Sequence, residues 1–362
     1  MKEEWFSIWN TVLTDYSKTG MYAQNVTHSI SVKNEKAFDK VRLRFNNTCG
    51  EEEAIYQNII LTLEDGRQYR LTCRGEEKVG ISPGKCIYLD EVQIGLASGT
   101  VTISYEVECL KLNNAALLPS TSYMQLTTEG MVTTAIPVYK EMVSSIPKQY
   151  HWHFGLDDIC LGIPHEIPWK KVLFLGDSNF HREYLVNSYR ECNPDTMCVN
   201  RGINGNRLLQ GTILPAMGEI NGIAAINRIK NETTLYHKIY ILIGINDIIL
   251  PYEYGKLQEV VSPEKLIAGL EALEKQAQSI CSSKDAIVFL TLLPFKGHPA
   301  WNGLSESIRN QVNRWIKTRN HLDISELVAC KTEPERLERA YAEEDALHLN
   351  EQGGNVVAVY MN

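Results

Sequence analysis

The length, composition and charge of the chain limit the classes of protein it can belong to. It has 362 residues, 44% of them hydrophobic, which suggests two domains that can each bury a core. Acidic side chains number 44 against 36 basic ones, a formal net charge of -8. Nucleic acids and anionic membranes require a clustered positive surface, so this balance disfavours both as main partners.

Cysteine usage and the first residues bear on metal binding and cellular location. The nine cysteines are scattered and odd in number, which disfavours a disulfide framework, and no Cys-x-x-Cys spacing occurs. His151 and His153 form a His-x-His pair without a third ligand at a familiar spacing. The chain starts MKEEWF, acidic where a signal peptide is basic, and its apolar runs are too short to span a bilayer. We therefore expect a cytoplasmic protein with reduced thiols and no metal.

Residues 1–145 are predicted to form β structure. Apolar and polar residues alternate in three runs, at Val41–Phe45, Asn58–Leu63 and Thr100–Leu110. Asp-Gly, Pro-Gly and Ser-Gly turn signals separate these runs. Several short strands at this spacing are typical of a sandwich. Residues 146–168 contain three prolines and are predicted to be an irregular linker.

From Trp169 onward the pattern changes to alternating strands and helices. Continuous apolar runs, which are typical of parallel strands covered on both faces, occur at 171–176, Tyr236–Gly244 and Asp285–Pro294. Helical patterns lie at Pro263–Ser279, with Ser262 as the expected N-cap, and at Glu306–Thr318. This alternation predicts a doubly wound α/β sheet.

Polar residues follow the predicted strands, at the sheet edge where parallel α/β sheets bind ligands. Ser178 follows the first apolar run and Asn246 follows the second. Gly205 lies in a polar stretch, RGINGNR, after a further β-like segment. Asp345 and His348 precede a short predicted helix at the C-terminal end of the sequence.

These residue types supply what acyl transfer requires. A serine hydroxyl is a weak nucleophile until a base such as His348 takes its proton. Asp345, three residues earlier, can orient the imidazole and stabilise its cation. Backbone N–H groups and the Asn246 amide can bind an oxyanion, and Gly205 allows close backbone approach. Each motif alone is commonly a turn or a surface ion pair, but their joint occurrence favours a serine hydrolase.

Four sequence blocks, in this order, resemble those of the SGNH (GDSL-type) hydrolases: GDS at 176–178, the glycine at 205, GIND at 244–247 and DALH at 345–348. Residues 169–358 are similar to bacterial GDSL-family esterases that carry an N-terminal β domain, and residues 1–145 resemble that β domain more weakly. The resemblance implies an SGNH flavodoxin-like α/β catalytic domain at 169–362. It also implies a jelly-roll-like sandwich at 1–145, followed by the linker at 146–168.

The resemblance further implies a role for each residue that matches a block. Ser178 would be the nucleophile, His348 its base and Asp345 the partner that orients His348. The N–H groups of Ser178 and Gly205 and the side-chain amide of Asn246 would form the oxyanion hole. No metal or other cofactor is expected.

Two further residues are expected to support the site, and one segment departs from the family pattern. Asp177 would be a structural member of the turn that carries the serine. Arg207 would brace the loop of Gly205 by donating to carbonyl groups. The family usually continues GDS with an Ile/Thr-Asp-Gly-like run, whereas Asn179–Tyr184 here reads NFHREY. Because these side chains border the serine, we expect an unusual acyl or leaving-group pocket.

The sequence as a whole predicts a serine esterase that acts through an acyl-serine intermediate. No long apolar lid is visible, and the β domain resembles modules beside sugar deacetylase sites, so the first choice of substrate is an acetylated carbohydrate. Alternatives are a lipase or lysophospholipase, a thioesterase, an aryl esterase, an acyltransferase and a non-catalytic carbohydrate-binding protein. The expected partner is a small-molecule or oligosaccharide ester, and homo-oligomer formation stays open.

Overall fold

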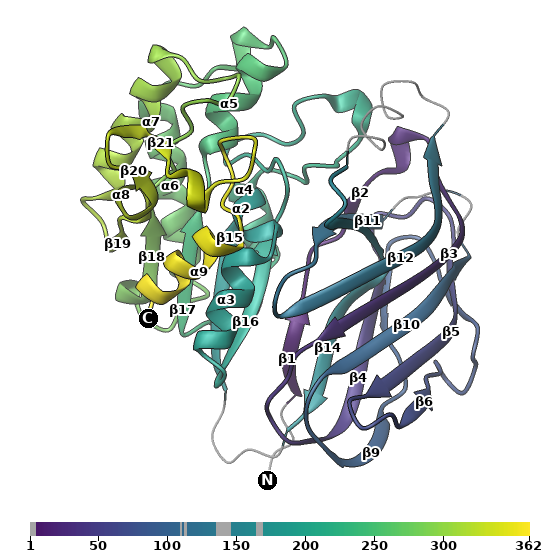
Figure 1. Ribbon diagram of the computed structural model, residues 1–362. Coiled ribbons are helices and arrows are strands. Elements are labelled where there is room, and N and C mark those ends of the chain that lie inside the picture. Colours follow the sequence, from purple (N-terminus) through teal and green to yellow (C-terminus); the bar gives the residue numbers. More distant parts are fainter. Residues whose placement is uncertain (1–4, 109–110, 112–113, 135–145, 164–168) are drawn as a thin grey trace. The chain divides into compact units, whose positions relative to one another are not determined.

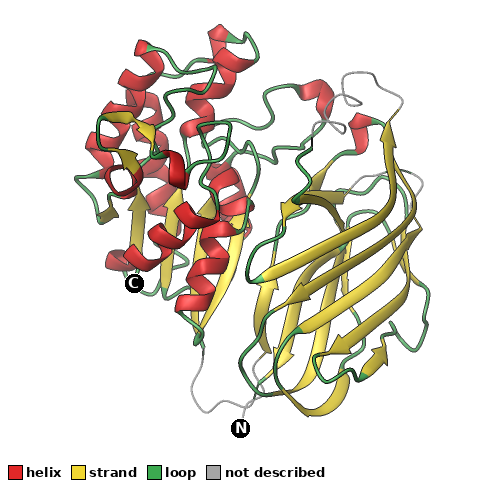
Figure 2. Ribbon diagram, in the orientation of Figure 1, coloured by secondary structure: helices red, strands yellow, loops and turns green. Residues whose placement is uncertain are grey.

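The computed structural model describes residues 5–108, 111, 114–134, 146–163 and 169–362. The chain divides into two compact units (Figure 1). The first, here called the β unit, comprises Met1–Trp169 together with Leu214–Ile220. The second, the α/β unit, comprises Lys170–Ile213 and Asn221–Asn362. Figure 2 shows that strands dominate the first unit and that helices and strands alternate in the second.

In its described residues, the β unit contains three antiparallel sheets. One has the order β1 (Trp5–Asn10), β14 (Leu156–Gly162), β4 (Phe38–Asn47), β8 (Lys85–Tyr88), with β9 (Val92–Ala97) also on β4. A second has the order β12 (Met124–Thr134), β3 (Met21–Val32), β10 (Val101–Glu108), β5 (Ala54–Leu63), β6 (Gln68–Arg70), with β7 (Val79–Ile81) also on β5. The third is β13 (Tyr150–Phe154), β11 (Asn114–Pro119), β2 (Thr14–Asp15). A short 3-10 turn, η1 (Ser17–Thr19), contacts another, η2 (Pro215–Met217).

The two larger sheets pack face to face, as the alternating pattern predicted. Along β4, Leu43 and Phe45 are fully buried, whereas Arg44 between them points to the other face. The Phe45 ring lies 4.9 Å from that of Tyr56 and 5.2 Å from that of Tyr105, both on the other sheet. Apolar side chains from two sheets therefore share one core, and the prediction of a sandwich is confirmed at this level.

The predicted linker is the main correction to the secondary structure. Residues 150–154 and 156–162 form β13 and β14, and β14 pairs with both β1 and β4 in the interior of a sheet. Gly155, with φ of +65°, provides the turn between these two strands. Side chains on both faces of this segment are buried, so the period-two alternation that identifies a half-exposed strand is absent.

The α/β unit is built on a five-stranded sheet whose strands are all parallel, which confirms the predicted α/β sheet. Its order is β16 (Thr196–Gly202), β15 (Lys170–Gly176), β17 (Lys238–Leu242), β18 (Ile287–Leu290), β19 (His321–Leu322). In chain order this is 2-1-3-4-5, the order of flavodoxin-like sheets. A two-stranded sheet pairs β20 (Ala329–Cys330) with β21 (Glu333–Leu337).

The helices of this unit are α2 (Ser178–His181), α3 (Tyr184–Cys192), α4 (Ala225–Arg228), α5 (Ile245–Glu253), α6 (Pro263–Ala277), α7 (Gly303–Ile316), α8 (Ile324–Val328) and α9 (Glu351–Tyr360). Short 3-10 turns are η3 (Ile229–Asn231), η4 (Leu257–Glu259), η5 (Lys284–Ala286) and η6 (Arg339–Tyr341). The predicted N-cap Ser262 accepts the N–H of Lys265, as expected for a helix that begins at Pro263. Over the described residues, every helix falls short of the length and apolar character that a membrane span requires.

The strand order locates the crevice in which a ligand would bind. β15 is the first strand of the unit and pairs with the second strand, β16, on one side and the third, β17, on the other. The connections after β15 and β17 therefore diverge, and ligands of such sheets bind beyond the carboxyl ends at this point. Gly176 pairs with Leu242, so the residues that follow these two strands lie at neighbouring positions of one edge.

A buried histidine pair in the β unit makes this unit sensitive to acid. Nε2 of His28 and Nδ1 of His153 are 2.8 Å apart, and both side chains have no exposed surface. The remaining ring nitrogens are bound to the hydroxyl of Thr128 and to the carbonyl oxygen of Leu156. Burial lowers the pKa of His153 to about 4 and, with the neighbouring imidazole, holds the pKa of His28 well below 6.5. Both rings are therefore neutral in the folded protein at pH 7.

We expect the β unit to lose stability as pH falls from 6.5 toward 4. Unfolded histidines take up protons near pH 6.5 while the folded ones do not. The loss by pH 5 is about 2 kcal/mol from His153, and His28 adds a loss of the same sign. Urea titrations at pH 7, 6 and 5 measure it, and Trp9, whose ring lies 5.0 Å from that of His153, contributes to the fluorescence signal. In His153→Gln the dependence should shrink, because one of the two buried rings is then absent. Equal pH dependence in the variant and the wild type would contradict this account.

Candidate active site

The turn after β15 presents Ser178 at the start of α2. Asp177 accepts the N–H of Asn179 at 3.1 Å and thereby caps this helix, and its own N–H donates to the carbonyl of Leu242 on β17. Gly176 has no room for a side chain, because a Cβ there would lie 2.4 Å from that same carbonyl oxygen. The backbone of Ser178 is consequently fixed from both neighbouring residues. Asp177 lies inside this turn, through its cap on Asn179 and its bond to Leu242.

The three side chains expected to form a triad lie within hydrogen-bonding distance. Nε2 of His348 is 2.7 Å from Oγ of Ser178, although 170 residues separate the two in the chain. Nδ1 of His348 is 2.6 Å from Oδ2 of Asp345. The other oxygen of Asp345 accepts the backbone N–H groups of Leu347 and His348, each at 3.0 Å. Serine, imidazole and carboxylate therefore form one continuous hydrogen-bonded series.

The protonation states of this series suit general base chemistry. Burial, and next the positive charge of Arg182, lower the pKa of His348 to about 4, against the opposing effect of Asp345. Burial alone would raise the pKa of Asp345, but its bond to His348 and the nearby positive charges hold that pKa well below its usual value. At neutral pH the imidazole is therefore uncharged and the carboxylate is ionised, so Nε2 of His348 can accept the proton of Ser178.

The backbone N–H groups of Gly205 and Ser178 are available to bind a substrate oxygen. Gly205 has φ of +69°, and a Cβ at this position would lie 2.2 Å from Nδ2 of Asn221. Only glycine fits here without strain. Among the hydrogen bonds between described residues, neither the N–H of Gly205 nor that of Ser178 is a donor. Both groups can therefore bind the oxygen of a substrate.

The GIND segment ties this loop to the start of α5. Nδ2 of Asn246 donates to the carbonyl oxygen of Asn206 at 2.9 Å, and a primary amide keeps a second N–H for another acceptor. The next residue, Asp247, accepts the N–H groups of Leu208 and Leu209 at 2.6 and 3.0 Å. Burial raises the pKa of Asp247 to about 6. The sequence analysis assigned Asp247 no role. Its position as the last residue of the GIND block at 244–247 could have indicated one.

Two arginines support the same region, and only one of them was predicted. Nε of Arg207 donates to the carbonyl oxygen of Gly211 at 2.8 Å, and its Nη1 pairs with Glu259 at 2.8 Å. Arg228 was missed. It donates to the carbonyl oxygens of Gly176 at 2.7 Å and Arg201 at 2.6 Å, and to Oδ1 of Asn206 at 3.0 Å. Arg228 thus joins the end of β15 to the Gly205 loop through direct hydrogen bonds.

The segment Asn179–Tyr184, whose sequence departs from the SGNH pattern, faces the protein interior and the residues around His348. The Phe180 ring is fully buried, 5.4 Å from the ring of Phe174. Oδ1 of Asn179 accepts the N–H of Leu349 at 3.2 Å, and Arg182 forms ion pairs with residues just before His348. Phe180 therefore packs in the interior, and Asn179 and Arg182 link the serine turn to the residues around His348. The expectation of an unusual acyl or leaving-group pocket stays a prediction.

Glu343, Asp345 and His348 form a group whose donor atoms lie within 4.8 Å of one another, close enough for a metal ion to bridge them. The arrangement of their partners does not fit a metal site. Arg182 contacts both carboxylates, and the two ring nitrogens of His348 are bound to Ser178 and Asp345. A cationic side chain therefore already supplies the positive charge that balances this acidic pair.

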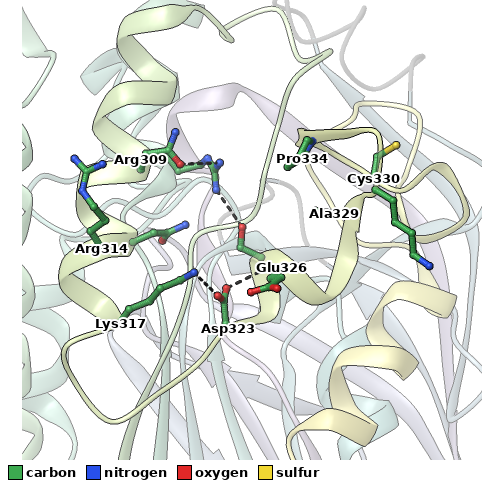
Figure 3. Close-up of a pocket in the computed structure, with 12 residues that line it drawn as sticks. Arg309, Arg314, Lys317, Asp323, Glu326, Ala329, Cys330 and Pro334 are labelled. Carbon is green, nitrogen blue, oxygen red and sulfur yellow. Dashed lines mark hydrogen bonds and ion pairs between the residues drawn. The ribbon is translucent and has the colours of Figure 1, made fainter.

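A cavity of about 660 Å³ lies elsewhere in the α/β unit, between α7, α8 and β20 (Figure 3). None of the candidate catalytic residues lines it. Its polar groups bind one another: Nη1 of Arg309 is 3.1 Å from Oγ of Ser325, and Lys317 pairs with Asp323 (Figure 3). Asn313, which also lines the cavity, is bound through its amide to the backbone of Leu292. These partners account for its buried polar groups, so the cavity adds nothing to the candidate site.

Comparison with known proteins finds only solved structures of low sequence identity and low TM-score. No family model and no curated protein matches the sequence. Among solved structures, the chain is similar to Axe2, an acetylxylan esterase from Geobacillus stearothermophilus, at 20% identity and a TM-score of 0.37, over 53% of this chain and 92% of that one. It is also similar to LAE5, an alpha/beta hydrolase enzyme from the metagenome of Lake Arreo, Spain, at 15% identity and a TM-score of 0.38, over 53% and 93%. The function proposed below rests on the geometry of the site.

Proposed function

We propose that this chain is a serine esterase of the SGNH type, with a jelly-roll-like accessory domain at its N-terminal side. The observation that carries the proposal is the hydrogen-bonded series from Ser178 through His348 to Asp345, with separations of 2.7 and 2.6 Å. Further support comes from its place at the carboxyl edge of a 2-1-3-4-5 sheet and from the order of the four sequence blocks. Together these features favour acyl transfer over the other reactions that a buried serine can serve.

The reaction proceeds in two halves. Oγ of Ser178 attacks the ester carbonyl carbon while Nε2 of His348 takes the hydroxyl proton, and Asp345 stabilises the imidazolium. The N–H groups of Ser178 and Gly205 and the second N–H of Asn246 bind the oxyanion. The attack forms a tetrahedral intermediate. Its collapse breaks the ester C–O bond to the alcohol, and the leaving alcohol takes the proton from His348. Water, deprotonated by His348, then attacks the acyl-serine, which releases the acid and restores Ser178.

The proposed substrate is a short-chain ester of a carbohydrate, acetyl in the first instance. Amide groups lie around the Gly205 loop. Asn221 donates to the carbonyl oxygen of Asn204, Asn246 donates to that of Asn206, and the Asn206 amide donates to the carbonyl oxygens of Asn221 and Ile223. Polar surroundings of this kind suit a sugar better than a long acyl chain. An acyltransferase would form the same acyl-serine and pass it to an alcohol. Product analysis with and without a sugar acceptor distinguishes the two activities.

A fluorophosphonate probe tests the proposed nucleophile directly. The wild type should gain one covalent adduct, and peptide mass spectrometry should place it on Ser178, because His348 activates that hydroxyl alone. Ser178→Ala should show no adduct. Ser188→Ala is the matched control, since Ser188 is a buried serine nearby in sequence whose hydroxyl is bound to the carbonyl oxygen of Tyr184. Labelling of another residue, with Ser178 unmodified, would end the proposal.

A further inference from the structure

Arg182 connects the serine turn to the loop that carries the base. Its backbone N–H donates to the carbonyl oxygen of Ser178 at 2.9 Å, which fixes its position relative to the serine. Its guanidinium forms an ion pair with Glu343 and lies 3.4 Å from Oδ2 of Asp345. The side chains of Arg182 and Glu343 are only 17% and 14% exposed, so solvent screens this pair weakly.

The segment Glu343–His348, here called the His348 loop, is compact enough to move as a unit. The N–H of Glu343 donates to the carbonyl oxygen of His348 at 2.9 Å, which closes the loop on itself. The carbonyl oxygen of Glu343 accepts the N–H of Ala346 at 3.2 Å, and Ala346 has φ of +56°, the left-handed region. Asp345 binds two backbone N–H groups of the same loop. A restraint applied at Glu343 and Asp345 is therefore transmitted to the ring of His348.

We propose that Arg182 is a positioning residue of this enzyme, which holds the His348 loop against the serine turn by binding Glu343 and Asp345 together. The inference rests on the proposed function, because it assigns a role only if Ser178 and His348 react as described. A guanidinium suits this task because its planar donors can contact two carboxylates at once, which an ammonium group does less well. Asn179 provides a second, uncharged link through the N–H of Leu349.

The charges around His348 give the proposal a signature that loss of packing alone would not produce. Besides burial, the groups that act on the imidazole are Arg182 and His298, which disfavour its protonation, and Asp345, which favours it. Glu343 offsets part of the charge of Arg182 through their ion pair. Removal of Arg182 should therefore raise the pKa of His348, whereas removal of the negative charge of Glu343 should lower it.

The test compares Arg182→Gln, Arg182→Lys and Glu343→Gln in profiles of kcat/KM against pH with p-nitrophenyl acetate. The acid limb of the wild-type profile, along which kcat/KM falls as pH decreases, is expected near pH 4, because the unprotonated base is the active form. In Arg182→Gln, kcat should fall by about tenfold to a hundredfold and the acid limb should move up by about one pH unit. Arg182→Lys should recover part of kcat and keep the wild-type limb. In Glu343→Gln the limb should move to lower pH.

Arg319→Gln is the matched control, because Arg319 forms a comparable ion pair with Glu271 that is exposed to solvent. It should change neither kcat nor the acid limb. The proposal is overturned if Arg182→Gln and Glu343→Gln move the acid limb in the same direction, or leave it in place, while melting temperatures show that both are folded. If Arg182→Gln does not fold, two results still decide: the shift of the acid limb to lower pH in Glu343→Gln relative to the wild type, and the wild-type limb expected of Arg182→Lys. Failure of the proposed function is separate, since activity would then persist in Ser178→Ala.

Discussion

Ser178→Ala and His348→Gln should each lower kcat for p-nitrophenyl acetate by at least about 10³-fold, and the double variant should be no slower than either single one. The reason is that the two side chains act as a unit. The hydroxyl of Ser178 is reactive only when its proton is taken up by Nε2 of His348, 2.7 Å away. The oxyanion donors remain in both variants, so a residual rate above that of water is expected in each. Steady-state kinetics at pH 7 measure these losses.

Residues Ser178 and His348 are 2% and 8% exposed, so the folding of each variant has to be measured beside its rate. Melting temperatures within a few degrees of the wild type would show that the loss is chemical. Ser188→Ala again serves as the control and should retain the wild-type kcat. Losses that add in the double variant would contradict the assignment, because independent groups would then be responsible for the reaction.

Asn246→Ala should lower kcat by about 10²-fold to 10³-fold and leave KM nearly unchanged. The amide N–H that binds the oxyanion contributes in the transition state, when negative charge develops on the carbonyl oxygen, and little in the ground state. Asn246→Asp should be slower still, because a carboxylate oxygen would face the oxyanion in place of a donor. Both rate constants follow from initial rates across a range of substrate concentrations.

Asn246 also binds the carbonyl oxygen of Asn206, so its loss has a structural component of about 1 kcal/mol. Asn227→Ala, which alters an exposed asparagine of α4, is the control for a general effect of losing an amide. A rise in KM with unchanged kcat in Asn246→Ala would show that the amide binds substrate and transition state equally. That result would remove Asn246 from the proposed oxyanion hole.

The candidate site could be located from the sequence because its reactive residues stand directly after strands or in short motifs. Ser178 follows a short continuous apolar run, which is typical of a buried parallel strand, and Asp345 and His348 are three residues apart. A parallel sheet then brings strand ends together at one edge, so distance along the chain does not matter. The sequence therefore sufficed to predict which side chains the structure places within 3 Å of one another.

Two of the supporting residues, Arg182 and Arg228, could not be predicted, because each is defined by its partners and not by a pattern. Arg182 and Arg228 are single charged residues in short, irregular segments, and nothing in their neighbourhood indicates whether they face solvent or a carbonyl group. The strands at 150–154 and 156–162 were missed for a related reason, since burial on both faces removes the alternation of a sandwich strand. In each case the information lies in tertiary contacts that only the folded chain contains.

The short stretch Leu214–Ile220 belongs to the β unit, although the residues on either side of it belong to the α/β unit. The polypeptide therefore changes unit three times, after Trp169, Ile213 and Ile220. One proteolytic cut after Trp169 would divide the covalent chain without separating the two bodies cleanly, since the N-terminal fragment would lack seven residues that the C-terminal fragment retains. Exchange of one unit for another by simple gene fusion would meet the same obstacle, because the β unit takes its residues from two separate stretches of the chain.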